Sequence, residues 1–191
     1  MVGKPPGWCY HAAVVITALV VAWWVSIPFP YAESGVLVIL VLVPLVSYWI
    51  IRLIVALTRD AEAVRHRFLG WLALPVIVGG LWLAVSADLP FTARFAVSQA
   101  SMERLAQNVL RGGPRDVPTC AGAGLFPMCG HIAGEDENAP IGVELQIIDW
   151  PITGSRCFVW APHGQPRAED YEYGLRHLTG PWWGCRGWDG W

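Results

Sequence analysis

Three long apolar runs constrain the fold of this chain more than any other feature of its sequence. They cover residues 12–29, 35–57 and 68–87, and Arg52 is the only charged residue in them. About 20 apolar residues in a helix cross the hydrocarbon core of a bilayer, so each run predicts a transmembrane helix. The sequence therefore predicts that residues 1–87 are a membrane anchor in contact with the lipid bilayer, and that residues 88–191 form one further domain.

Basic residues lie between the second and third runs. Arg59, Arg65 and Arg67 occupy this segment, and Arg52 lies just upstream, where its long side chain can extend to the inner membrane boundary. Lys and Arg beside a span resist translocation, so these four residues set the topology by keeping the segment in the cytoplasm. With three spans, we expect a multi-pass protein of the cell membrane with a cytoplasmic N-terminus and an extracytoplasmic C-terminal domain.

Charge excludes two classes of function. The apolar runs, apart from Arg52, lack the ionisable side chains that ion and proton pathways usually need at membrane depth, which argues against a transporter, pump or channel acting alone. Residues 88–191 carry eight arginines against twelve acidic residues. Nucleic acid is not an expected partner, because binding to phosphates needs a basic surface.

The C-terminal domain has mixed helical and strand patterns. Residues 91–97 predict a short strand, and Ser98 is predicted to cap a helix over residues 99–111. Residues 111–140 are rich in glycine and proline and predict a long loop. Two antiparallel strands are expected over residues 143–147 and 156–161. Residues 171–178 fit either a short helix or a strand, and the last twelve residues have no regular period.

Four of the five cysteines lie in this domain, whereas Cys9 precedes the first apolar run. An extracytoplasmic location permits disulfides, and we favour pairing Cys120 with Cys129 and Cys157 with Cys185 over the other two possible pairings. The sequence thus predicts three transmembrane α-helices followed by a small disulfide-stapled α+β extracytoplasmic domain.

Metal binding and catalysis are weaker interpretations of the same residues. Zinc could use Cys129 and His131 with His163, His177 or another cysteine, but the chain has no Cys-x-x-Cys spacing. No nucleophile motif accompanies the histidines. We therefore predict no catalytic, cofactor-binding or metal-binding residues.

The aromatic C-terminus is the candidate binding surface. It contains Trp182, Trp183, Trp188 and Trp191 among glycines. An exposed tryptophan can stack on a sugar, fill a pocket of a protein partner or rest at the membrane interface, and a buried one would pack in the core of the domain.

The C-terminal half also resembles a group of uncharacterised actinobacterial membrane proteins. The resemblance rests on the predicted order of strand, capped helix, glycine-rich loop and hairpin, followed by Tyr171-Glu172 and by Leu178-Thr179-Gly180-Pro181-Trp182-Trp183. It implies an N-terminal helical anchor with a small outer domain, and it implies no activity.

These features predict a non-catalytic bacterial cell-envelope protein. Its outer domain is expected to bind a membrane or envelope protein partner, as an accessory subunit would. Two alternatives remain open, which are binding of envelope glycan or lipid through the tryptophan-rich C-terminus and a zinc-dependent extracytoplasmic enzyme.

Overall fold

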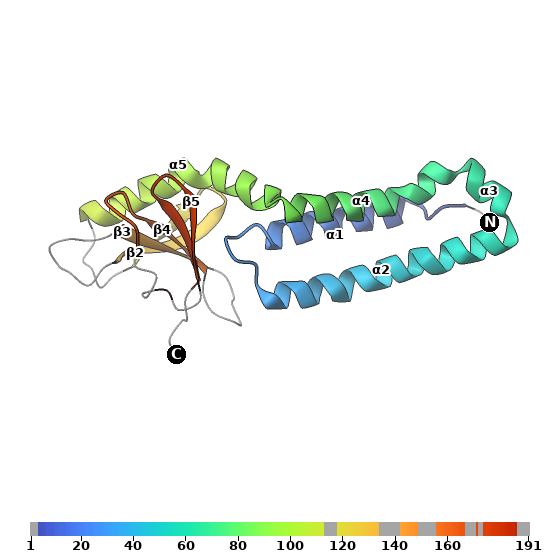
Figure 1. Cartoon of the computed structure of the whole chain (residues 1–191), viewed down its shortest axis with the longest axis horizontal. Helices are drawn as coiled ribbons and strands as arrows, with labels where there is room; N and C mark the ends of the chain where they lie inside the picture. The colour runs from blue at the N-terminus through green and yellow to red at the C-terminus, as the bar shows by residue number, and fades with distance from the viewer. Residues whose placement is uncertain are drawn as a thin grey trace. The chain divides into compact units, whose positions relative to one another are not determined.

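The structure is a computed structural model that describes residues 4–112, 118–133, 142–148, 156–166, 171 and 174–186. Within these ranges the chain begins with helices and continues with strands (Figure 1). The helices are α1 (Trp8–Trp24), α2 (Ala32–Arg59), α3 (Ala61–His66), α4 (Phe68–Ser86) and α5 (Leu89–Gly112). The strands are β1 (Thr119–Ala123), β2 (Phe126–Ala133), β3 (Gly142–Ile147), β4 (Arg156–Trp160), β5 (Leu175–Thr179) and β6 (Trp182–Arg186).

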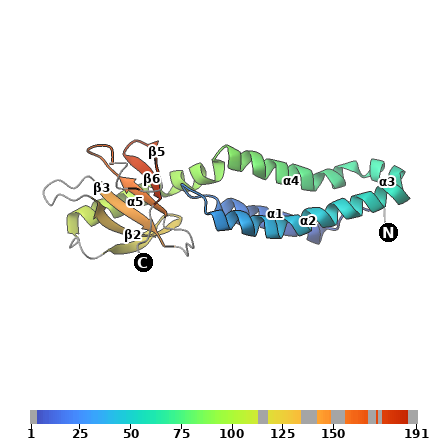
Figure 2. The same cartoon turned by 60° about the horizontal axis from the view of Figure 1, so that its bottom comes forward.

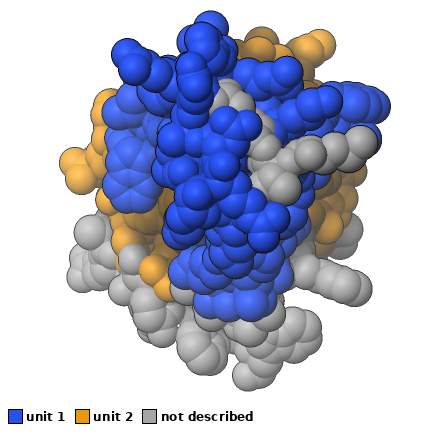
Figure 3. Space-filling model, turned by 90° about the vertical axis from the view of Figure 1, so that its right-hand side faces the viewer, with its two compact units in different colours: residues 1–25, 32–90 blue, residues 26–31, 91–191 orange. Residues whose placement is uncertain are grey.

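The chain forms two compact units (Figure 3). The helical unit comprises Met1–Val25 and Ala32–Pro90, and the sheet unit comprises Ser26–Tyr31 and Phe91–Trp191. The sequence suggested one division, after Ala87. In the structure the short segment Ser26–Tyr31 also belongs with the C-terminal residues, so the chain passes between the two units three times.

Two helices of the described residues are long and apolar enough to cross a membrane. They are α2, over Ser34–Arg59, and α4, over Phe68–Ser86, whose most apolar 18-residue stretches have mean hydropathies of 2.5 and 2.1. The most apolar part of α2 has 0% of its residues buried in the protein, which leaves an apolar surface for lipid to cover. The structure therefore supports two candidate spans where the sequence predicted three.

The first predicted span is shorter in the structure than in the sequence pattern. Helix α1 has 17 residues and ends at Trp24, whereas the apolar run continues to Phe29. Proline at positions 28 and 30 explains the early end, since proline lacks the N–H group that continues a helix and disfavours helical backbone in the residue before it. Helix α1 packs against α2 and α4 in the helical unit, and the Tyr10 hydroxyl donates a hydrogen bond of 2.8 Å to the Leu45 carbonyl of α2.

Helix α5 replaces two predicted elements. The predicted strand over residues 91–97 is wrong, because α5 begins at Leu89 and runs without a break to Gly112. Its buried side chains recur every three or four residues from Phe91 to Val109, which is the spacing of one helix face. Ser98 lies inside this helix and not at its N-terminus, and its hydroxyl accepts a hydrogen bond of 2.9 Å from the Leu125 N–H group.

In the part of the chain that the structure describes, six strands form one antiparallel sheet in the order β1-β2-β3-β4-β6-β5. The predicted strands 143–147 and 156–161 are confirmed as the neighbours β3 and β4. The long loop predicted over residues 111–140 is wrong where β1 and β2 form a hairpin. Residues 171–178, which fitted either a helix or a strand, contribute to strand β5, and the C-terminal segment without a period contributes β6.

The β1–β2 hairpin turns at Gly124 and contacts α5 there. Gly124 has a φ angle of +67°, and a Cβ atom at this position would lie 2.7 Å from the Cα atom of Ser98. Both the backbone conformation and the close approach require glycine.

Helix α5 lies along one face of the sheet, and the main core lies between them (Figure 1, Figure 2). Buried side chains of the helix meet the alternate side chains of the strands that point to the same face. From α5 they include Phe91, Phe95, Met102, Leu105, Ala106 and Val109, and from the sheet Phe126, Met128, Val143, Leu145, Phe158, Trp160 and Trp182.

Candidate functional site

Among the described residues, the sheet face opposite α5 carries the four bonded cysteines, Glu144 and the histidines at positions 131 and 177. Because neighbouring strands are in register, side chains at opposed positions form rows across this face. One row runs through Cys120, Cys129, Gln146, Cys157 and Cys185, from β1 to β6. We call this sheet face the cysteine face.

Both disulfides lie in this row. The structure joins Cys120 to Cys129 and Cys157 to Cys185, which are the pairings favoured from the sequence. Each pair occupies opposed positions on adjacent antiparallel strands. The environments differ, since Cys157 and Cys185 are 1% and 0% exposed whereas Cys120 is exposed. Cys9 in α1 is a free and exposed thiol.

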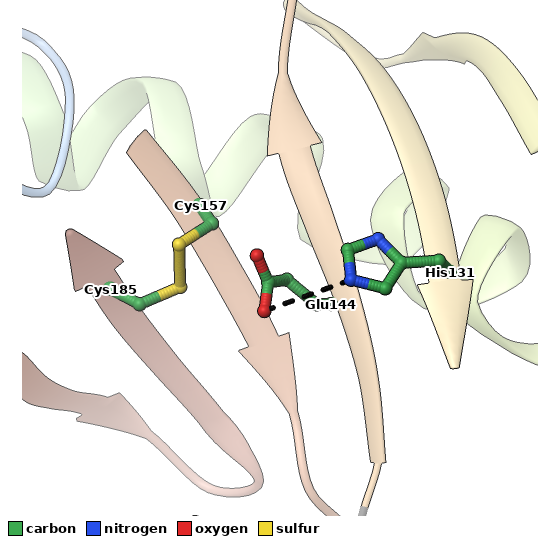
Figure 4. The surroundings of a disulfide bond; sticks show 4 residues. All are labelled: His131, Glu144, Cys157 and Cys185. Atoms are coloured by element: carbon green, nitrogen blue, oxygen red, sulfur yellow. Dashed lines mark ion pairs between the residues drawn. A yellow bond between two sulfur atoms is a disulfide. The ribbon is translucent and has the colours of Figure 1, made fainter. Parts of the chain in front are cut away.

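A second row on the cysteine face contains two of the histidines considered above. It runs through His131, Glu144, Val159, Trp183 and His177. The Nε2 atom of His131 lies 3.9 Å from the Oε2 atom of Glu144, with side-chain exposures of 41% and 21%. The Glu144 carboxylate lies between the His131 ring and the buried Cys157–Cys185 disulfide (Figure 4).

His177 has a structural role at the opposite end of this row. Its Nε2 atom lies 3.0 Å from the Gly180 carbonyl in the turn between β5 and β6, and its ring packs edge-on against Trp183 with 4.6 Å between ring centroids. These contacts hold the turn in place. Three strands lie between His177 on β5 and His131 on β2, so the two histidines do not meet.

A different set of metal-ligating groups comes together on the cysteine face. A carboxylate oxygen of Glu144 and the sulfur atoms of Cys157 and Cys185 all lie within 4.8 Å of one another. The zinc set considered from the sequence is not assembled, because three strands separate His177 from His131 and His163 is exposed in a loop. The sequence offers no spacing motif for the new set, since its members come from three strands.

The candidate tryptophan surface is only partly available. Trp182 is fully buried and packs edge-on against Phe95, so it belongs to the core and cannot contribute to an exposed surface. Trp183 points to the cysteine face and is half-buried. Alternate residues of a strand point to opposite faces, which explains why these neighbours differ. Trp188 and Trp191 lie outside the described residues.

Two buried arginines, which the sequence analysis did not single out, hold Ser26–Tyr31 in the sheet unit. Arg94 of α5 donates hydrogen bonds of 3.0 Å to the Ser26 hydroxyl and 2.7 Å to the Leu125 carbonyl. Arg94 is only 9% exposed, and its guanidinium carbon lies 4.0 Å from the centroid of the Phe126 ring. The sequence signal was an arginine on the apolar face of a helix.

Arg156 of β4 makes the equivalent contacts at the other end of this segment. It is 0% exposed, its Nε atom donates a hydrogen bond to the Phe29 carbonyl, and its guanidinium carbon lies 4.3 Å from the centroid of the Tyr31 ring. Gly184 of β6 lets the segment approach closely, because a Cβ atom there would lie 2.6 Å from Cβ of Pro28. We call Arg94, Arg156 and the segment Ser26–Tyr31 the arginine clamp.

The four arginines predicted to set the topology lie around the end of α2, in α3 and before α4, away from the C-terminal end of α4. Arg59 ends α2, Arg65 lies in α3, and Arg67 directly precedes α4. Arg52 lies two turns before the end of α2, where its Nη1 atom donates a hydrogen bond of 2.7 Å to the Tyr48 hydroxyl. Its Nη2 atom donates a second hydrogen bond of 3.4 Å to the Lys4 carbonyl, so Arg52 has polar partners on its own helix and in the segment before α1.

Comparison of the chain with protein-family models, curated proteins and solved structures finds no match.

Proposed function

We propose that this protein is a non-catalytic, membrane-anchored cell-envelope protein whose sheet unit binds another membrane protein outside the cytoplasm. The observation that carries the proposal is the arginine clamp, because it builds the connection between α1 and α2 into the sheet unit. The chain therefore crosses between the two units three times, after Val25, after Tyr31 and after Pro90. Three crossings suit a domain that meets a partner in the same membrane.

The proposed topology has three spans. In support, α1 packs on both α2 and α4, and the segment after α1 shares a compact unit with the chain after α4. Both connections must then be on the same side of the membrane, with the basic segment between α2 and α4 on the other side. At 1.5 Å per residue α1 is about 26 Å long, slightly shorter than a bilayer core of about 30 Å. A bilayer accommodates such a difference by local thinning.

The proposed orientation places the sheet unit outside the cytoplasm. Arg59, Arg65 and Arg67 favour the cytoplasm for the opposite end of the anchor. Two disulfides in the sheet unit support an oxidising compartment for it. Charge and cysteine chemistry are independent signals, and they agree.

The cysteine face is the proposed binding surface. The other sheet face is covered by α5, whereas Glu144, His131 and Trp183 on the cysteine face are partly exposed. A half-buried tryptophan in the same row as an ion pair combines a rigid apolar contact with polar groups that fix orientation, which is typical of a protein interface. Glycan binding through the four tryptophans has less support, because Trp182 is in the core.

Site-specific photo-crosslinking tests this function. A photoreactive phenylalanine analogue is introduced at His131 on the cysteine face or, as a matched control, at the exposed Arg104 on α5. In native membranes we expect the His131 position to capture one discrete integral membrane protein and the Arg104 position not to capture it. Trp183→Ala should reduce this adduct at least about tenfold while the protein remains folded, because a central aromatic contact is worth about 2 kcal/mol.

Three outcomes would contradict the proposal. They are no adduct from His131, equal adducts from both positions, and an adduct that contains only a second copy of this chain. Thermal unfolding of the Trp183→Ala variant in detergent separates loss of the contact from loss of the fold.

A further inference from the structure

The four side chains of Figure 4 include three kinds of zinc-ligating group. We propose that reduction of the Cys157–Cys185 disulfide creates a zinc site, whose ligands are Cys157, Cys185, Glu144 and His131. In this proposal the disulfide and the metal are alternative cross-links between the same strands. The inference does not depend on the proposed binding function.

The distances are close to those that zinc needs. Zinc binds sulfur at about 2.3 Å and nitrogen or oxygen at about 2.0–2.2 Å, so neighbouring ligand atoms of a tetrahedral site lie about 3.3–3.8 Å apart. The carboxylate of Glu144 and the two sulfur atoms already lie within 4.8 Å of one another. The Nε2 atom of His131 lies 3.9 Å from Glu144 Oε2. His131 contacts this group only through Glu144, so its side chain has to turn toward the sulfur atoms, once their bond is broken, to become the fourth ligand.

The donor set selects the metal. Two thiolates with one imidazole and one carboxylate suit zinc, whereas magnesium and calcium prefer sites made only of oxygen ligands. Val159 and Trp183 pack beside the cysteines and provide an apolar surrounding for the thiolates. His131 and Glu144 are partly exposed, at 41% and 21% of their side chains, and this opening gives the metal a path from solvent.

The other disulfide provides an internal comparison. Cys120 and Cys129 are bonded in the same row of the cysteine face, but among the described residues only Glu144, Cys157 and Cys185 form a group of three or more such ligands. Reduction of both disulfides should therefore create one metal site and not two.

The redox step is a thiol–disulfide exchange with a dithiol reductant. Its two thiols reduce the bond between Cys157 and Cys185, two protein thiols form, and the reductant becomes a cyclic disulfide. Binding of Zn²⁺ then displaces the two thiol protons to solvent, because the metal binds the thiolates. Oxidation reverses the exchange and releases the metal.

Metal titration of the full-length protein in detergent tests the site. The wild-type protein is reduced, desalted without oxygen and titrated with Co²⁺ and then Zn²⁺. We expect one equivalent of Co²⁺ with a thiolate charge-transfer band that Zn²⁺ abolishes, and no binding by the oxidised protein. Zinc should protect Cys157 and Cys185, but not Cys120 and Cys129, from alkylation detected by peptide mass spectrometry.

Substitutions identify the ligands. Glu144→Gln and His131→Gln should each weaken Zn²⁺ binding at least about tenfold. The double variant with Cys120→Ser and Cys129→Ser should bind zinc as the wild type does. The proposal is overturned if the reduced wild type binds no metal, if zinc protects all four cysteines alike, or if the Cys120/Cys129 variant loses binding. A reduced protein that unfolds and does not refold with zinc also overturns it.

Discussion

Replacing Arg156 by alanine is expected to lower the free energy of unfolding of the sheet unit by about 3 kcal/mol or more. The side chain is fully buried, so its removal leaves a cavity and takes a charge-assisted hydrogen bond from the Phe29 carbonyl. It also removes the contact of the guanidinium with the Tyr31 ring. Arg156→Lys should be intermediate, because lysine keeps the charge and loses the planar contact.

Denaturant unfolding of the full-length protein in detergent, followed by near-UV circular dichroism, measures this loss. Arg104→Ala is the matched control, since Arg104 is an exposed arginine on α5 that bonds only to its own helix in the described contacts. The control should change the free energy of unfolding by no more than about 0.5 kcal/mol. If Arg156→Ala behaves like this control, the clamp does not stabilise the sheet unit.

Removing the Cys157–Cys185 disulfide is expected to cost more stability than removing Cys120–Cys129. The bonded cysteines are 28 residues apart in the first pair and 9 in the second. Chain entropy then gives losses of about 3.5 and about 2.5 kcal/mol. Burial increases the difference, because Cys157 and Cys185 are buried in an apolar cluster with Val159 and Ala161, whereas Cys120 is exposed.

Two double-alanine variants, one for each disulfide, test this order by thermal unfolding without added metal. Alanine is preferred to serine at the buried pair, because an unpaired hydroxyl would add a cost of its own. Equal melting temperatures would show that loop length and burial do not determine the contribution of these bonds. A lower melting temperature for the Cys120/Cys129 variant would reverse the expected order.

The sequence pattern predicted the strands of the sheet unit correctly where apolar and polar residues alternate regularly. Residues 143–147 alternate, and β3 is buried on alternate positions facing α5. The prediction of a strand over residues 91–97 was wrong because it relied on the β-branched and aromatic residues of this segment. The spacing of Phe91, Phe95 and Met102 continues the face of the helix that follows, and packing on the sheet outweighs local propensity.

The arginine clamp could not be predicted from local pattern. It joins Ser26 to Arg94 and Phe29 to Arg156, so its contacts span 68 and 127 residues of chain. The sequence placed Pro28 and Phe29 at the end of a span because they are apolar. Apolar composition alone does not separate a residue that contacts lipid from one that contacts a protein core.

The disulfide pairing was accessible from the sequence, but the metal-ligating group beside it was not. Cys120 and Cys129 are close enough in the chain to suggest a local loop, and pairing them leaves one partner each for Cys157 and Cys185. Glu144 reaches the second disulfide only through the register of β3 with β4. Strand register depends on the whole sheet, since a shift of one residue would turn Glu144 to the α5 face.

The central claim is that the sheet unit and the cytoplasmic end of the anchor lie on opposite sides of a membrane. The most direct test labels two single free cysteines with a membrane-impermeant maleimide. One variant keeps the free thiol of Cys9, and the other combines Cys9→Ser with Gln165→Cys at an exposed position of the sheet unit. In intact cells we expect labelling of the Gln165→Cys variant alone, and labelling of Cys9 only after the membrane is opened. Labelling of Cys9 in intact cells without labelling of the other variant would contradict the account.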